Sequence, residues 1–123
     1  MTVLNAAATL QIAGNFGTDY ATSTIEVLAG TNVLATHSTT SWAATNTGNN
    51  GTATAVIANS GAATITGAGT QTATSATITD GTEVITLTVG LSGSGADLIL
   101  NTLTYINGET STISSLVLTV PAS

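Results

Sequence analysis

Basic side chains and cysteine are both missing from this chain of 123 residues, which has no lysine, no arginine and no cysteine. Without cysteine it forms neither disulfides nor thiolate metal sites. Without lysine or arginine it cannot pair its six acidic residues internally, and its formal net charge is −6. Proteins that bind nucleic acids or anionic membrane surfaces use lysine and arginine to contact phosphate groups. The sequence therefore argues against nucleic acid and against membranes as partners.

Charged and aromatic side chains are scarce, at 5% and 3% of the residues. An average domain has about a quarter of its residues charged, so threonine, serine and asparagine must supply the polar surface here. Alanine cannot replace the buried volume of aromatic rings, and the core is therefore expected to be thin. A thin core favours an obligate homo-oligomer, in which a neighbouring copy completes the burial.

Long apolar runs are also missing, since no stretch reaches the roughly 18 residues that a membrane-spanning helix needs. The N-terminus has no basic residue, and Asn5 and Gln11 interrupt its apolar stretch, so it does not have the pattern of a secretory signal. We therefore expect a soluble protein. Its length predicts a single domain over residues 1–123.

Runs of threonine, valine and isoleucine recur between glycine and asparagine clusters, which predicts β-strands joined by short turns. The expected strands cover residues 7–13, 22–28, 33–38, 52–58, 62–66, 71–79 and 83–89. A tight turn is expected at Gly30, and residues 41–51 are expected to form a polar loop around Trp42. Alanine favours helices, but the threonines and glycines around Ala6-Ala7-Ala8 argue for a strand there. The pattern predicts an all-β fold, a jelly-roll-like β-sandwich.

Two further strands are expected at the C-terminus, over residues 97–106 and 112–120, on either side of an Asn107-Gly108 turn. This arrangement is typical of a β-hairpin. Both faces of each run are partly apolar, which predicts burial on both sides, one in the core and one in a subunit contact. The side chains expected to build this strand pair or the contact are Leu98, Leu100, Tyr105, Leu116, Leu118 and Val120. Trp42 is expected to be at least partly buried against the sandwich.

His37 is the only histidine in the chain and the only side chain that titrates near neutral pH. Together with Ser38 and Asp19 it could be written as a Ser-His-Asp set. Serine is so abundant here that such a trio arises by chance, and we expect His37 on an outward strand face. The sequence thus predicts no catalytic residues, and we expect that the protein is not an enzyme.

Two acidic positions raise the question of a metal ion. Asp80 and Glu83 could contribute to a Ca²⁺ site, but a hairpin turn with a solvated Glu83 explains the same residues more simply. Asp97 follows the glycine-rich segment over residues 90–95 and is expected to cap amide groups of that loop. We predict no metal and no cofactor.

The late motif Leu91-Ser92-Gly93-Ser94-Gly95-Ala96-Asp97-Leu98-Ile99-Leu100-Asn101, followed by Asn107-Gly108 and Leu118-Thr119-Val120-Pro121-Ala122, resembles a family of small virion structural proteins of tailed bacteriophages. Two earlier segments, residues 23–30 and 51–55, are also similar to that family. The family often carries an aromatic-rich strand with an arginine before an Asp-x-Gly-Thr turn. The matching strand here, residues 72–79, has neither feature.

The resemblance implies a component of a virus particle rather than an enzyme. We therefore expect a capsid decoration protein that assembles as a homotrimer or larger homo-oligomer and contacts other virion proteins, chiefly the major capsid protein. It would be made in the host cytoplasm and located in the virion. The alternative is a receptor- or glycan-binding domain of a head or tail fibre, or a collar or tail protein. Glycans stack on exposed aromatic rings, for which Tyr20 and Trp42 are the candidates.

Overall fold

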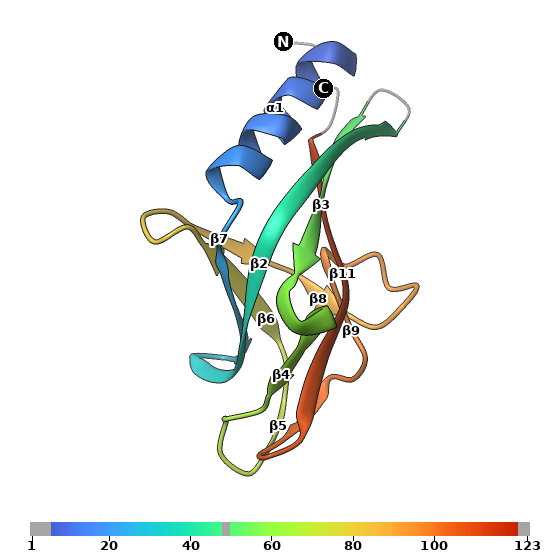
Figure 1. Ribbon diagram of the computed structural model, residues 1–123. Coiled ribbons are helices and arrows are strands. Elements are labelled where there is room, and N and C mark those ends of the chain that lie inside the picture. Colours follow the sequence, from blue (N-terminus) through green and yellow to red (C-terminus); the bar gives the residue numbers. More distant parts are fainter. Residues whose placement is uncertain (1–5, 48–49, 121–123) are drawn as a thin grey trace.

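The computed structural model describes residues 6–47 and 50–120, and it shows a nearly all-β chain with one α-helix (Figure 1). The elements are α1 (Ala6–Asp19), β1 (Thr24–Ala29), β2 (Asn32–Thr47), β3 (Asn50–Ile57), the short 3-10 helix η1 (Ala58–Gly61), β4 (Ala62–Thr64), β5 (Thr70–Thr72), β6 (Ser75–Thr79), β7 (Val84–Leu87), β8 (Val89–Gly90), β9 (Leu98–Leu100), β10 (Thr104–Ile106) and β11 (Thr110–Val120). The prediction of an all-β fold is confirmed, and the jelly-roll topology stays a prediction. No helix within the described ranges has the length and apolar character needed to span a membrane.

One large sheet contains most of the strands, in the order β7-β6-β1-β2-β3-β11-β9-β8, with β4 pairing to β11 beside this path. The long strand β2 pairs with β1 through its first half and with β3 through its second half. Likewise β11 pairs with β4, β9 and β3 along its length. The sheet therefore curves until its two halves face each other (Figure 1). Strands β5 and β10 form a separate two-stranded sheet.

The core is enclosed between the two halves of the curved sheet. It forms because inward apolar positions alternate with outward polar ones along the strands. Its main side chains are Ile25, Val27, Leu34, Ile78 and Leu87 from one half, and Leu98, Leu100, Tyr105, Ile113 and Leu116 from the C-terminal strands. Most of these residues are aliphatic, which agrees with the scarcity of aromatic residues in the sequence.

The strand predicted over residues 7–13 is wrong, because these residues belong to α1. Alanine has the highest intrinsic helix propensity, and the two glycines of the helix only weaken it. The helix packs against β2, β3 and β11, with Ala13 fully buried. A Cβ on Gly14 would lie 3.9 Å from the Cβ of Ala44, so small residues let the helix approach β2 closely. This packing stabilises a helix that would be marginal alone.

The polar loop predicted over residues 41–51 is also wrong, because residues 41–47 belong to β2 and residues 50 and 51 to β3. Residues 48 and 49 lie outside the described part of the chain. The register runs from Thr39 paired with Ile57 to Thr47 paired with Asn50. Across the pair, the hydroxyl oxygens of Thr45 and Thr52 are 2.7 Å apart. Threonine is β-branched and suits a pleated strand even where the sequence is polar.

The two C-terminal runs pair only in part as predicted. Leu98 lies opposite Leu116, and Leu100 opposite Ile113, in the β9–β11 pair. The Asn107-Gly108 turn closes, since the N–H of Glu109 donates to the carbonyl of Ile106 at 3.0 Å. The flanking strands do not pair with each other, because β10 pairs with β5 and the start of β11 pairs with β4. The expected simple hairpin is therefore replaced by a long connection that carries β10 to another sheet.

Hydrogen bonds between Thr88 and Asp97 join the two ends of the glycine-rich loop over residues 90–95. The carboxylate Oδ2 of Asp97 accepts hydrogen bonds from the backbone N–H and the hydroxyl of Thr88, both at 3.2 Å. In return, the N–H of Asp97 donates to the Thr88 hydroxyl at 2.9 Å. Asp97 thus caps the residue before the loop, not the amides of the loop itself as predicted, and holds the parallel pair β8–β9 together.

Candidate functional site

The residues predicted to build the C-terminal strand pair or a subunit contact lie mostly in the core. The fully buried ones are Leu98, Leu100, Tyr105 and Leu116. Leu118 is half-buried and packs at the edge of the core, and the side chain of Val120 lies outside the described residues. Because the chain itself covers the buried side chains, a contact with another copy would use the opposite side of β11.

That opposite side is a small exposed surface with no charged residue, which we call the outer β3–β11 face. It consists of Ala43, Thr54, Val56 and Val117, all exposed. Val117 lies opposite Thr54, which lies opposite Ala43 on β2, and Val56 follows two residues along the same strand face. Val56 is 51% exposed. The sequence pattern pointed to two-sided burial of the C-terminal strands but not to the contribution of β3.

A second, partly exposed surface, which we call the hydroxyl face, covers the outside of β7, β6, β1 and β2. Its members are the exposed Thr36, Ser38 and Thr86 and the half-buried Thr24, Thr77 and Thr79, with the exposed Val84 beside Thr79 at its edge. The register sets them in adjacent rows, with Thr86 opposite Thr77, and Thr79 opposite Thr24. Glu26 is the only charged residue among them and is half-buried.

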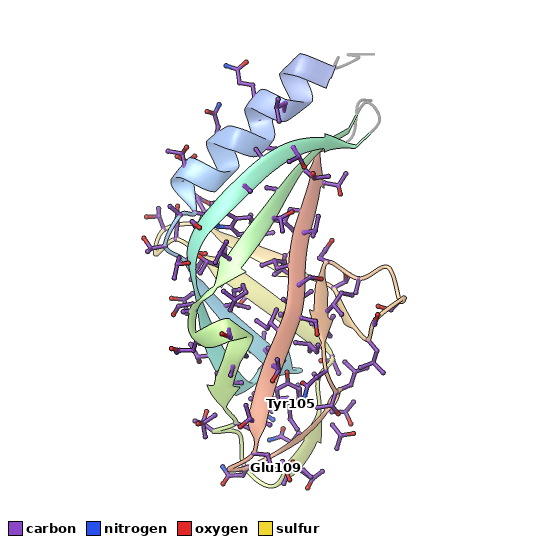
Figure 2. The ribbon with its side chains drawn as sticks, turned by 45° about the vertical axis from the view of Figure 1, so that its right-hand side comes forward. Tyr105 and Glu109 are labelled. Atoms are coloured by element: carbon purple, nitrogen blue, oxygen red, sulfur yellow. The ribbon has the colours of Figure 1, made fainter. Side chains whose placement is uncertain are left out.

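His37 faces the core opposite Ile25, so the prediction of an outward position is wrong. Its Nε2 lies 3.0 Å from the hydroxyl oxygen of Ser111, which lies 2.7 Å from the hydroxyl of Tyr105. Figure 2 shows Tyr105 beside the lower part of β11. The neighbouring Ser38 lies on the opposite, exposed side of the strand. The Ser38-His37-Asp19 set is therefore not assembled.

Burial shifts the pKa values of His37 and Tyr105, the two titratable groups of this network. The pKa of His37 is lowered because burial disfavours the charged imidazolium. The pKa of Tyr105 is raised by burial, and its hydrogen bond with Ser111 acts in the opposite direction. Within the described chain, Nδ1 of His37 has no hydrogen-bond partner. We assign the proton to Nε2, donating to Ser111, because this tautomer leaves an acceptor unpaired rather than a donor.

A serine and a histidine at hydrogen-bond distance have the geometry of an activated nucleophile and its base. Here Ser111 is 0% exposed, and the third group is the Tyr105 hydroxyl instead of a carboxylate. A substrate could not reach the serine without opening the core. We therefore interpret the network as a link between β2, β10 and β11.

Trp42 and Tyr20 are joined by a hydrogen bond and do not offer free rings. The indole Nε1 of Trp42 donates to the backbone carbonyl of Tyr20 at 2.7 Å. Trp42 lies on β2 and is half-buried, and Tyr20 is buried. The exposed stacking rings on which a glycan-binding role would rest are therefore missing at these two positions.

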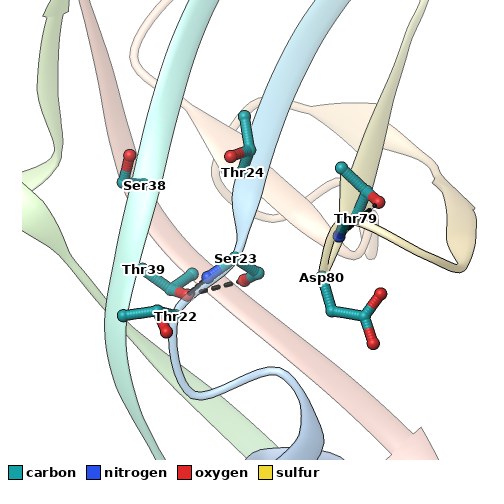
Figure 3. Close-up of a pocket in the computed structure, with 8 residues that line it drawn as sticks. Thr22, Ser23, Thr24, Ser38, Thr39, Thr79 and Asp80 are labelled. Carbon is teal, nitrogen blue, oxygen red and sulfur yellow. Dashed lines mark hydrogen bonds between the residues drawn. The ribbon is translucent and has the colours of Figure 1, made fainter.

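A pocket with a volume of about 310 Å³ opens where the α1–β1 connection, β2 and the β6–β7 turn meet (Figure 3). The lining residues are Thr22, Ser23, Thr24, Ser38, Thr39, Thr79, Asp80 and Gly81. The hydroxyl oxygens of Ser23 and Thr39 are 2.6 Å apart, and the Ser23 N–H also donates to the Thr39 hydroxyl at 2.9 Å. Both residues are buried, so they form the inner part of the pocket.

Asp80 is the only charged residue of the pocket lining. Its Oδ1 accepts the N–H groups of Thr82 and Glu83 at 2.8 and 2.9 Å, and these amides, that of Glu83 first, lower the pKa of the Asp80 carboxyl. The turn spans four residues between β6 and β7. Nowhere in residues 6–47 and 50–120 do three or more histidine, cysteine or acidic side chains gather as a metal site would require.

Comparison of the chain with protein-family models, with curated proteins and with solved structures finds no match. The chain's own residues and the surfaces described above are therefore the basis on which its function is inferred.

Proposed function

We propose that this chain is a structural component of a tailed-bacteriophage virion, a capsid decoration protein that assembles as a homo-oligomer on the particle. The observation that carries the proposal is the near absence of charge on two sheet faces, the small outer β3–β11 face and the larger hydroxyl face. Proteins that act on small molecules usually concentrate convergent polar groups in a deep apolar pocket. Here the two surfaces of low charge instead follow the strands of the sheet.

The outer β3–β11 face supports contact with another subunit. Val56 and Val117 supply apolar area, and Thr54 and Ala43 beside them are small. Desolvation of charged groups is the main electrostatic penalty of a buried contact. This face has no charged group, so covering it does not incur that penalty. Charge depletion is also typical of the central part of protein interfaces.

The hydroxyl face supports an outward position on the particle. Threonine and serine hydroxyls keep a sheet face hydrated without adding charge. In this arrangement the outer β3–β11 face contacts other copies, and the major capsid protein binds elsewhere on the oligomer. The phage-like C-terminal motif described above supports the same role. We propose no enzymatic activity, since the serine–histidine pair lies inside the core.

Quantitative mass spectrometry of virions from the phage that encodes this chain tests the proposal. We expect the number of copies of this chain per virion to be in a fixed ratio to the number of major capsid protein copies. We also expect the chain to be released from the particle as an oligomer. Absence from purified virions would refute the virion role. A few copies confined to fibres, with binding to host-cell glycans, would instead establish the receptor-binding alternative.

A further inference from the structure

The pocket between the α1–β1 connection and the β6–β7 turn combines one fixed carboxylate with several hydroxyl groups that are not used in hydrogen bonds within the described chain. Within the described part of the chain, the side-chain hydroxyls of Thr22, Thr24 and Ser38 make no hydrogen bond, whereas that of Thr79 accepts only the N–H of Gly81 at 3.0 Å. Figure 3 shows Asp80 on one side of the pocket and Thr22 on the other, with the Ser23–Thr39 pair between them.

The Asp80 carboxylate is held in place and only half used. Its Oδ1 is occupied by the two amides of the β6–β7 turn, which fixes the orientation of the group. Among the described residues, no hydrogen bond reaches Oδ2. One oxygen therefore remains available to a donor that enters the pocket, and charge-assisted hydrogen bonds to a carboxylate are stronger than neutral ones.

No lysine or arginine balances the negative charge around this pocket. The chain contains no lysine or arginine, so Asp80 cannot be paired by a basic side chain of its own. Two further acids lie in the same region: Glu83 belongs to the same β6–β7 turn, and Asp19 ends α1 next to Tyr20. The pKa of Tyr20 is raised by burial and then by the charges of Asp80, Glu83 and Asp19. No lysine or arginine of this chain can therefore supply a cation to the site.

The lining also favours a planar cation over a sugar. No aromatic residue lines the pocket, whereas sugar sites generally use rings for stacking. A guanidinium group has five N–H donors in a rigid fork, which fit one carboxylate oxygen and several hydroxyl acceptors. The volume of about 310 Å³ is at the small end of ligand pockets and suits one long side chain.

We propose that this pocket binds the guanidinium group of an arginine on a partner polypeptide, with Oδ2 of Asp80 and the hydroxyls of Thr22, Thr24 and Ser38 as acceptors. This inference goes beyond the virion role and does not depend on it, since any arginine-bearing partner could use the pocket.

Nuclear magnetic resonance titration of the full chain with N-acetyl-arginine amide, at low ionic strength, tests the proposal. We expect saturable shifts of the backbone amides of Ser38, Thr79 and Gly81, with a Kd on the order of 10 mM for this minimal probe. N-acetyl-lysine amide should bind more weakly, because an ammonium group cannot contact several acceptors in one plane.

The variant Asp80→Asn keeps the Oδ1 acceptor for the turn amides and removes the charge, and we expect it to weaken arginine binding at least about fivefold. Glu109→Gln is the matched control, since Glu109 is an exposed acid at the far end of the molecule (Figure 2), and it should change nothing. Equal effects of the two variants would mean unspecific attraction and would overturn the proposal. Equal shifts with the lysine probe would overturn the guanidinium assignment, and shifts with methyl glucoside alone would overturn the cation.

Discussion

Among single residues, His37 has the environment that differs most from the one its sequence pattern predicts. It is 4% exposed and bonded through Nε2 to Ser111, which makes it a neutral member of the core. Burial is the cause of its lowered pKa, so protonation would leave a positive charge in the core with a donor at Nδ1 that has no partner.

The stability of the fold should therefore depend on pH through His37. The folded pKa lies below the unfolded value of about 6.5, so the unfolded chain binds more protons and stability rises with pH. The contribution is complete above about pH 6.5 and is lost as the pH falls from there towards the folded pKa. We expect the free energy of unfolding from urea titrations to decrease between pH 7.5 and pH 5.

His37→Gln is the control for this pH dependence, because glutamine stays neutral over the same range. The variant should show a flatter pH profile than the wild type, whatever its absolute stability. Identical slopes in the two proteins would contradict the assignment to His37.

Trp42 is expected to stabilise the fold through both its buried area and its hydrogen bond to the Tyr20 carbonyl at 2.7 Å. Because the residue is half-buried, Trp42→Ala should cost about 2–3 kcal/mol, below the range for fully buried aromatic residues. Trp42→Phe keeps most of the area and should lose about 1 kcal/mol for the hydrogen bond. Chemical denaturation measures both, and an unchanged stability of Trp42→Ala would contradict this account.

Among the strands, β11 connects three other strands of the large sheet. It pairs with β4 near its start, with β9 in its middle and with β3 near its end. Leu116 is 0% exposed, whereas Leu118 is half-buried. The two leucines should therefore differ in their contribution to the stability of the fold, although they lie on the same strand face.

Leu116→Ala should cost about 2–5 kcal/mol because it removes a fully buried side chain and leaves a cavity. Leu118→Ala should cost clearly less, about 1–2 kcal/mol, since its side chain is already partly hydrated. Urea unfolding of both variants gives the comparison. A larger loss for Leu118→Ala would show that this side chain is covered by another molecule, such as a neighbouring subunit.

The conformation of the short helix η1 requires glycine at position 61. The φ of Gly61 is +85°, and a Cβ on this residue would overlap the backbone carbonyl of Ile113 in β11. Gly61→Ala should therefore destabilise the fold by about 3 kcal/mol or more, from backbone strain together with overpacking. Gly69, with φ of +63° and open space around its Cβ position, is the control. Gly69→Ala should cost only about 1–2 kcal/mol in thermal or chemical unfolding.

For the whole molecule, the uncharged faces and the thin core favour assembly. We expect the purified chain to sediment as a trimer or larger oligomer at micromolar concentration. Val56→Asp should shift it towards the monomer, because a charge on the outer β3–β11 face must be desolvated in the contact. Thr36→Asp, on the hydroxyl face, should leave the oligomer intact. A folded wild-type monomer, or dissociation by Thr36→Asp alone, would contradict this contact surface.

The sequence by itself determined the fold class and several local features. Alternating β-branched and polar residues have a period that only strands satisfy, and the β1–β2 turn at Gly30 was predicted at the observed position, with Ala29 opposite Asn32. The pairing of Leu98 with Leu116 also agrees with the predicted C-terminal strand pair. These features depend on residues that are neighbours in the chain and on the local geometry that those residues favour, so they can be predicted from the sequence.

Only the tertiary structure decided the helix, the long β2–β3 hairpin and the site residues. Residues 7–13 have no decisive local preference, and packing of α1 against β2, β3 and β11 selected the helix. The breaks within the predicted strands over residues 71–79 and 83–89 likewise follow from changes of partner. His37 and Ser111, which are in contact, and Ser38 and Asp80, which line one pocket, are far apart in the chain, and no local pattern predicts such neighbours. The available signal was that His37 shares a strand face with the apolar Ala35, and Ser111 with the apolar Ile113, but the side of a strand that faces the core is fixed only when the sheet closes.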